Sequence, residues 1–175
     1  MPLRPFRGTV PSLGPGAYVD PTALVVGDVV LGEDVSIWPM VVVRGDVNHI
    51  RIGARSNVQD CSMLHVSRPY PGNDAGWPLV VGEDVVVGHK VALHGCSIGH
   101  RVLVGIGAIV LDGVVVQDDV VIGAGSVVTP GKVLESGGLY VGNPARRSRD
   151  LTADELARTP RMAAHYVALK REYST

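Results

Sequence analysis

The residues of this 175-residue chain best suited to chemistry are three of its six histidines, His65, His89 and His94. They lie on either side of a segment at 67–78 that is rich in proline and glycine. Three neutral imidazoles and one open position make the catalytic zinc site that generates hydroxide from water near neutral pH. A lone histidine is more often a surface or structural residue, so the hypothesis depends on a fold that brings these three together.

A six-residue repeat supplies that fold. Aliphatic residues recur at every sixth position and are often followed by glycine; the longest run is Ile98, Val104, Val110, Val116, Ile122, Val128 and Leu134. Period six predicts an all-β fold, a parallel β-helix in which three hexads make one triangular coil and coils stack about 4.8 Å apart. The composition agrees, because only 5% of residues are aromatic and 22 are glycine, which suits a narrow core with tight corners.

Breaks in the repeat place two of the histidines. An insertion after Leu64 predicts an external loop at about 67–78, and one residue is missing after Leu93. With these breaks removed, Leu64 and Leu93 stack in one column, and the residues that follow them, His65 and His94, lie one above the other about 4.8 Å apart. Two imidazoles at that separation can share a metal ion with bonds of about 2.1 Å.

The third histidine belongs to a different strand of the triangle. By the same count Val58 and Val87 share the preceding column, and Asp60 lies beneath His89. We expect His89 to be too far round the prism to complete the site within one chain, so that a neighbouring subunit supplies it in a closed threefold ring. We expect surface positions for His49, His100 and His165. We expect small buried or corner positions for Cys61 and Cys96.

The end of the chain has a helical pattern. Thr152 and Glu155 have the spacing of a capping box, and apolar residues recur at helical spacing in Met162, Tyr166, Leu169 and Tyr173. We predict a β-helix domain at 1–150 and a helix at 151–175 that packs on the prism and blocks edge-to-edge stacking. Pro160 is expected to break or kink that helix.

Charge and composition exclude several partners. The net charge is −1 and the pI about 6.6, so nothing attracts the chain to nucleic acid or an anionic membrane surface. No stretch reaches the ~20 apolar residues of a spanning helix, and the N-terminus does not have the pattern of a signal peptide. Two cysteines cannot build a disulfide framework, so we expect a cytoplasmic protein.

Several motifs of the chain together resemble the γ-class carbonic anhydrase family over roughly residues 10–146. They are Arg44-Gly45-Asp46, Ile52-Gly53, Asn57-Val58-Gln59-Asp60, His65, Gly88-His89 and His94-Gly95-Cys96. The resemblance implies a left-handed β-helix and a homotrimer with metal sites at the subunit interfaces. It also implies His65 and His94 as ligands from one chain and His89 from the next. Zinc is the expected metal, with iron(II) or cobalt(II) as alternatives, because imidazole suits all three.

The resemblance also implies roles for other residues. In the family, the pair that matches Arg44 and Asp46 forms a salt bridge across the interface. The positions that match Asn57, Gln59 and Asp60 line the site, and the Gln59 amide is the best candidate to orient water or bicarbonate. Tyr140 has two equally weighted interpretations, a residue that approaches the site and a packing residue beneath the C-terminal helix.

The predicted reaction is attack of metal-generated hydroxide on carbon dioxide to give bicarbonate. The glutamates that serve proton transfer in the best-studied type of this family have no evident counterpart, since Val47 follows Asp46 and the loop holds Asp74 but no glutamate. Three alternatives stay open: a metal-dependent thioesterase, a hexapeptide acyltransferase that uses coenzyme A, and a metal-binding or assembly subunit without catalysis. An acyltransferase needs one histidine as base, so the clustered histidines count against it.

Overall fold

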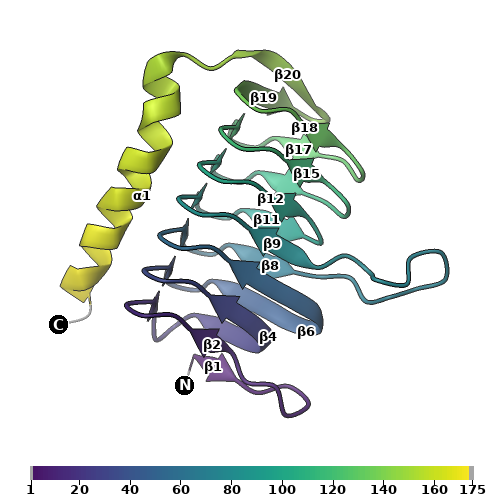
Figure 1. Cartoon of the computed structure of the whole chain (residues 1–175), viewed down its shortest axis with the longest axis vertical. Coiled ribbons are helices and arrows are strands. Elements are labelled where there is room, and N and C mark those ends of the chain that lie inside the picture. The colour runs from purple at the N-terminus through teal and green to yellow at the C-terminus, as the bar shows by residue number, and fades with distance from the viewer. Residues whose placement is uncertain (1, 174–175) are drawn as a thin grey trace.

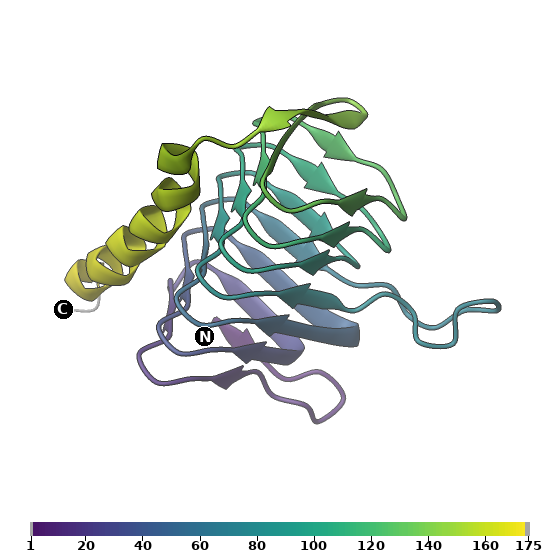
Figure 2. The same ribbon diagram turned by 45° about the horizontal axis from the view of Figure 1, so that its top comes forward.

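A computed structural model describes residues 2–173 of the chain. It confirms the predicted fold class: the chain winds into a parallel β-solenoid of about 8 turns, followed by a single α-helix (Figure 1). Turned by 45°, the molecule shows the helix along one side of the stacked coils and a long loop projecting on the other (Figure 2). Within residues 2–173, no helix has the length and apolar character needed to cross a membrane.

Each coil gives one strand to each of three faces, named here the first, second and third faces in chain order, and β4 and β6 bend round a corner to serve two. The first face consists of β1 (Leu3–Arg4), the first parts of β4 (Leu24–Leu31) and β6 (Val42–Ile52), β8 (Met63–His65), β11 (Ala92–His94), β14 (Ile109–Val110) and β17 (Val127–Val128). The second face consists of β2 (Ser12–Leu13), the remainders of β4 and β6, β9 (Leu79–Val81), β12 (Ser97–Ile98), β15 (Val115–Val116) and β18 (Val133–Leu134). The third face consists of β3 (Tyr18–Val19), β5 (Ser36–Ile37), β7 (Asn57–Val58), β10 (Val86–Val87), β13 (Leu103–Val104), β16 (Val121–Ile122) and β19 (Gly138–Gly142), with β20 (Ala145–Asp150) antiparallel to β19.

The coils stack in the register that the repeat predicts. Leu64 pairs with Leu93 in the first face, and Val58 pairs with Val87 in the third. All four side chains are buried, because the residue at each repeat position points into the prism. The long loop leaves the corner between the first and second faces after β8, which agrees with the insertion predicted at 67–78.

Glycine has two uses at the corners: Gly113, for example, takes the left-handed backbone that a tight turn favours, with φ of 69°, whereas Gly53 does not. Gly53 lies between the second and third faces, and a Cβ there would lie 2.6 Å from the backbone of Gly82 in the next coil. The left-handed residues of this corner are instead charged, such as Arg55 and Asp84 with φ of 60° and 55°. Their side chains bond to each other, with 2.7 Å between Nε and Oδ1. Glycine here permits close stacking of coils, and ion pairs line the turn itself.

The helix α1 (Ala153–Tyr173) begins with the capping box that the sequence predicts. The Glu155 amide donates to the Thr152 hydroxyl at 3.3 Å, and the Glu155 carboxylate accepts from the Thr152 amide at 2.9 Å. Of the break or kink expected at Pro160, the break is wrong, since one helix continues through it. Ala163, one turn further on, is fully buried, so packing on the solenoid holds the helix where the proline removes a hydrogen bond.

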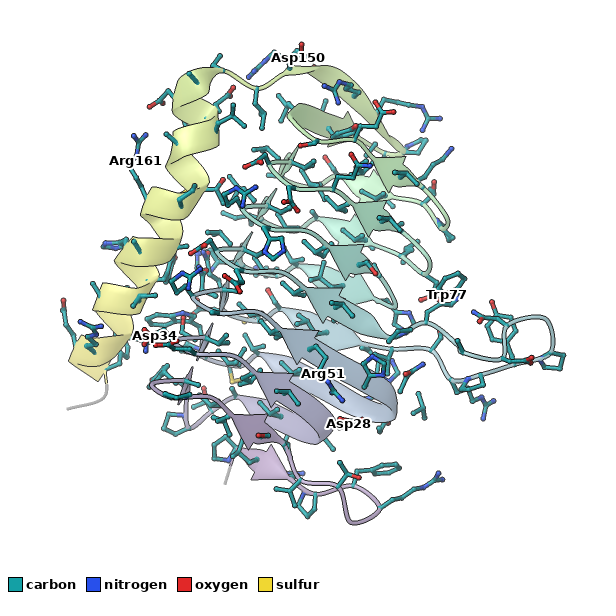
Figure 3. The ribbon with its side chains drawn as sticks, in the orientation of Figure 1. Asp28, Asp34, Arg51, Trp77, Asp150 and Arg161 are labelled. Carbon is teal, nitrogen blue, oxygen red and sulfur yellow. The ribbon has the colours of Figure 1, made fainter. Side chains whose placement is uncertain are left out.

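The far end of α1 is anchored to the first coils. The rings of Tyr166 and Tyr173 lie against Trp38, with centroids 5.5 and 5.1 Å away. The buried ammonium of Lys170 lies 2.6 Å from the carboxylate of Asp34, which Figure 3 labels beside the lower end of the helix. The helix therefore runs back along the third face from the last coil towards the first (Figure 1).

Candidate metal centre

His65 and His94 are brought together by strand pairing. They end β8 and β11, are partners in the parallel register, and have ring centroids 5.1 Å apart, close to the coil spacing. The Nδ1 atom of His65 lies 3.1 Å from Nε2 of His94. Both side chains are partly exposed at the corner between the first and second faces, where the long loop begins.

The other nitrogen of each ring bonds to a carboxylate. His65 Nε2 lies 3.0 Å from Oδ1 of Asp46, and His94 Nδ1 lies 2.5 Å from Oδ1 of Asp112. A carboxylate only accepts, so these two nitrogens carry the ring hydrogens and the facing nitrogens present lone pairs. A carboxylate that orients a histidine in this way is the usual outer partner of a metal-ligating imidazole.

The protonation states suit a cation. Burial lowers the pKa of His65, as do the charges of Arg44 and His94, and together they outweigh the opposite effect of Asp46. Burial raises the pKa of Asp46, but the hydrogen bonds from Arg44 and His65 outweigh it and hold the pKa below its usual range. His65 is therefore neutral and Asp46 ionised at pH 7, which are the forms that metal binding requires.

The facing nitrogens have a spacing that fits a shared metal. Two imidazole nitrogens bound tetrahedrally at 2.0–2.1 Å would lie about 3.4 Å apart, and those of His65 and His94 are 3.1 Å apart. Two lone pairs this close repel unless a cation or a proton lies between them. The donor chemistry of the pair thus fits zinc or a similar ion and supplies two of the ligands it needs.

His89 lies at another corner. It precedes β11, whereas His94 ends that strand, so one side of the prism separates them at roughly 3.3 Å per residue. Its Nδ1 lies 3.0 Å from Oδ2 of Asp60, the contact that the repeat count predicts, so Nε2 remains available. Within residues 2–173 no three histidine, cysteine, aspartate or glutamate side chains gather closely enough to hold a metal. A complete site of the predicted kind would need a second chain.

Gln59 and Asn57 lie on the outer side of the third face and are buried. Gln59 Nε2 donates to Oδ1 of Asn57 at 3.1 Å, and the buried Asn57 Nδ2 has no partner among the described residues. Gln59 also lines a cavity between the solenoid and α1 together with His89, Met162 and Tyr166. The amide thus lies near His89 and away from the His65–His94 pair.

The other residues named from the sequence lie as follows. Arg44 pairs with Asp46 within this chain, 2.5 Å away, because the two alternate on one side of β6. Tyr140 belongs to the core of the last coils, three coils (about 14 Å) above Val87 in the same column. Its hydroxyl accepts from the Glu135 amide at 2.7 Å.

Of the residues predicted at the surface or at corners, only His49 is more buried than expected. His100 and His165 are exposed, whereas His49 is half-buried. Cys61 is exposed at a left-handed corner, with φ of 62°, and Cys96 is buried.

Asp112 is the functional candidate that sequence reasoning missed. It follows Val110, the partner of Leu93 in the next coil, by two positions. Asp60 follows Val58 by the same two positions and was placed beneath His89 on that count. Applied one coil further, the count places Asp112 above Gly95, the residue after His94, so it brings a carboxylate to this corner without indicating which side chain it contacts.

Comparisons with known proteins give the chain its family. The model of the bacterial transferase hexapeptide (six repeats) matches residues 95–130. Protein YrdA of Escherichia coli (strain K12) is 54% identical over 171 residues, 98% of this chain and 93% of that protein. A carbonic anhydrase of Geobacillus kaustophilus is 40% identical over 171 residues, 98% of this chain and 90% of the relative.

A solved structure agrees with these relatives. The crystal structure of a hexapeptide transferase family protein from Anaplasma phagocytophilum superposes with a TM-score of 0.91 at 36% identity, covering 98% of this chain and 97% of that one. The long alignment to a carbonic anhydrase includes the stretch that carries the histidines and their carboxylates. The chain therefore belongs to the γ-class carbonic anhydrase-like family of hexapeptide-repeat proteins.

Proposed function

We propose that this protein is a metal-dependent enzyme of the carbonic anhydrase type that converts carbon dioxide to bicarbonate. In this proposal each metal is held by His65 and His94 of one subunit and His89 of the next, in a homotrimer. The observation that carries it is the pair of facing nitrogens, 3.1 Å apart, whose rings are each oriented by a carboxylate. The family relationship to a carbonic anhydrase supports the reaction.

The metal, when bound, supplies a nucleophile near neutral pH because it lowers the pKa of water. Zinc is our first choice, and iron(II) and cobalt(II) suit the same donors. The chain's own residues bind and orient. One carboxylate accepts a hydrogen bond from a ring nitrogen of each histidine: Asp46 from His65, Asp112 from His94 and Asp60 from His89. The other ring nitrogen of each histidine then keeps its lone pair for the metal. We assign the orientation of bicarbonate to the Gln59 amide, because Gln59 lines the cavity beside His89.

Hexapeptide acyl transfer is the second candidate, because the chain superposes on a hexapeptide transferase family protein. Such a reaction needs one histidine as general base. Three histidines, each with its own carboxylate, exceed that need and favour metal binding. Turnover of acetyl-coenzyme A without added metal would support the transferase instead.

The test is metal content and carbon dioxide hydration of the wild type and His89→Ala, purified with zinc and, without oxygen, with iron. We expect stoichiometric metal and hydration in the wild type and loss of both in the variant. His165→Ala, which removes an exposed histidine of α1, is the matched control and should keep both. A wild type without stoichiometric metal would contradict the proposal. A metal-loaded wild type without hydration would favour a thioesterase or a non-catalytic metal-binding subunit.

A further inference from the structure

The root of the loop at 67–78 is fixed to the solenoid. Ser67 and Trp77 exchange backbone hydrogen bonds, with nitrogen–oxygen distances of 2.9 and 3.1 Å. Asn48 donates from Nδ2 to the carbonyls of Ser67 and Ala75 at 3.1 and 2.8 Å. Figure 3 shows Trp77 where the projecting loop meets the coils. The loop thus extends from a closed, hydrogen-bonded base that begins two residues after His65.

One carboxylate joins this base to the histidine pair. Asp112 accepts from Nδ1 of His94 through Oδ1 at 2.5 Å and from the hydroxyl of Ser67 through Oδ2 at 2.8 Å. Hydrogen bonds to an ionised acceptor are about twice as strong as neutral ones. Because both oxygens are used, the carboxylate cannot turn towards one partner without loosening its hold on the other.

The backbone leaves room for this arrangement at two glycines. A Cβ on Gly95, directly after His94, would lie 2.6 Å from Cβ of Trp77 and would overlap Oδ1 of Asp112. A Cβ on Gly113, directly after Asp112, would lie 2.9 Å from the Trp77 ring. Both glycines have left-handed backbones, with φ of 52° and 69°. Glycine therefore allows the carboxylate and the loop base to approach each other at this corner.

We propose that Asp112 is a positioning residue that clamps His94 and the base of the loop together, so that the orientation of the metal-binding ring and the order of the loop at 67–78 are coupled. The proposal rests on the proposed function, because it treats His94 as a ligand. A cation on Nε2 makes the Nδ1 hydrogen a stronger donor to Asp112, which in turn fixes the acceptor of Ser67. By linkage, a firmer loop base must favour cation binding by the same factor.

The experiment is a double-mutant cycle of Ser67→Ala, Asp112→Ala and the pair, with Ser97→Ala, an exposed serine of β12, as the matched control. Amide hydrogen exchange at Ser67 and Trp77 is measured in chelator-treated protein and again with cobalt(II). The cobalt(II) dissociation constant and visible spectrum report the coordination of His94, which a purely structural role would leave unchanged.

We expect Ser67→Ala to speed exchange at the loop base roughly tenfold, as loss of a charged hydrogen bond implies. It should also weaken cobalt(II) binding several-fold and shift the spectrum. Asp112→Ala should weaken binding by roughly 10- to 100-fold, and Ser67→Ala should then add nothing further. Ser67→Thr, which keeps the hydroxyl, should restore wild-type behaviour.

Three results would overturn the clamp. One is a Ser67→Ala protein that matches Ser97→Ala in both exchange and cobalt(II) affinity. Another is a pair of substitutions whose effects simply add. The third is chelator-treated Asp112→Ala with wild-type exchange at the loop base; should that variant unfold, Asp112→Asn takes its place. A wild type that binds no cobalt(II) refutes the proposed function and the metal arm of this proposal together, whereas one that binds it equally in all variants refutes the clamp alone.

Discussion

Mixing two defective variants tests whether the metal site is shared between chains. His65→Ala destroys the half of the site at the end of β8, and His89→Ala destroys the half at the corner before β11. In the proposed trimer, one chain supplies His65 and His94 to a site and the next chain supplies His89. A site is therefore intact only where a His89→Ala chain, which keeps His65, is followed by a His65→Ala chain, which keeps His89. Random assembly of equal amounts meets both conditions in about a quarter of the sites, one half multiplied by one half.

The assay is zinc content and carbon dioxide hydration of the two chains co-expressed with different tags. Selection for both tags removes homotrimers and raises the expected fraction to about a third, because each mixed ring of three then has one complete site. The control is His65→Ala mixed with His94→Ala. Since these two residues are strand partners in one chain, no mixture can rebuild their half of the site. Equal recovery in both mixtures, or none in either, would refute the shared site.

Two further predictions follow from the same corner. Gly95→Ala should abolish high-affinity zinc binding, because the added methyl group overlaps the Asp112 carboxylate. The control is Gly107→Ala, since Gly107 also has a left-handed backbone but has open space around it. This variant should be less stable by calorimetry and should still bind zinc in a metal titration. Because the pKa of His65 is lower in the folded protein, this histidine is protonated in the unfolded chain first as the pH falls. Its contribution to the free energy of unfolding is therefore full above about pH 6.5. That contribution is lost as the pH falls through the pKa of the folded state. Urea unfolding of the metal-free protein at pH 5.5 and 7.5 should show a smaller loss in His65→Ala than in His165→Ala, and equal losses would contradict this reasoning.

The period of six was enough to predict much of the fold and two of the side-chain contacts at the candidate site. A solenoid repeats one translation, so counting positions along the chain also counts positions up each face. That count placed His65 next to His94 and Asp60 next to His89, and the structure has both contacts. The interruption of the six-residue repeat after Leu64 also located the loop at 67–78.

Features that depend on contacts between side chains needed the tertiary structure. The repeat did not indicate that Asp112 holds His94 and Ser67 with its two oxygens, because this depends on how three side chains turn at a corner. Nor did local propensity predict that α1 continues through Pro160, since packing on the third face outweighs one missing hydrogen bond.

The sequence by itself determined which residues share a column, because stacking height follows from position in a regular repeat. Only the tertiary structure decided which nitrogen of each imidazole faces its neighbour and which bonds to a carboxylate. The orientation of each ring arises from side-chain packing in three dimensions, which the spacing of residues along the chain does not encode.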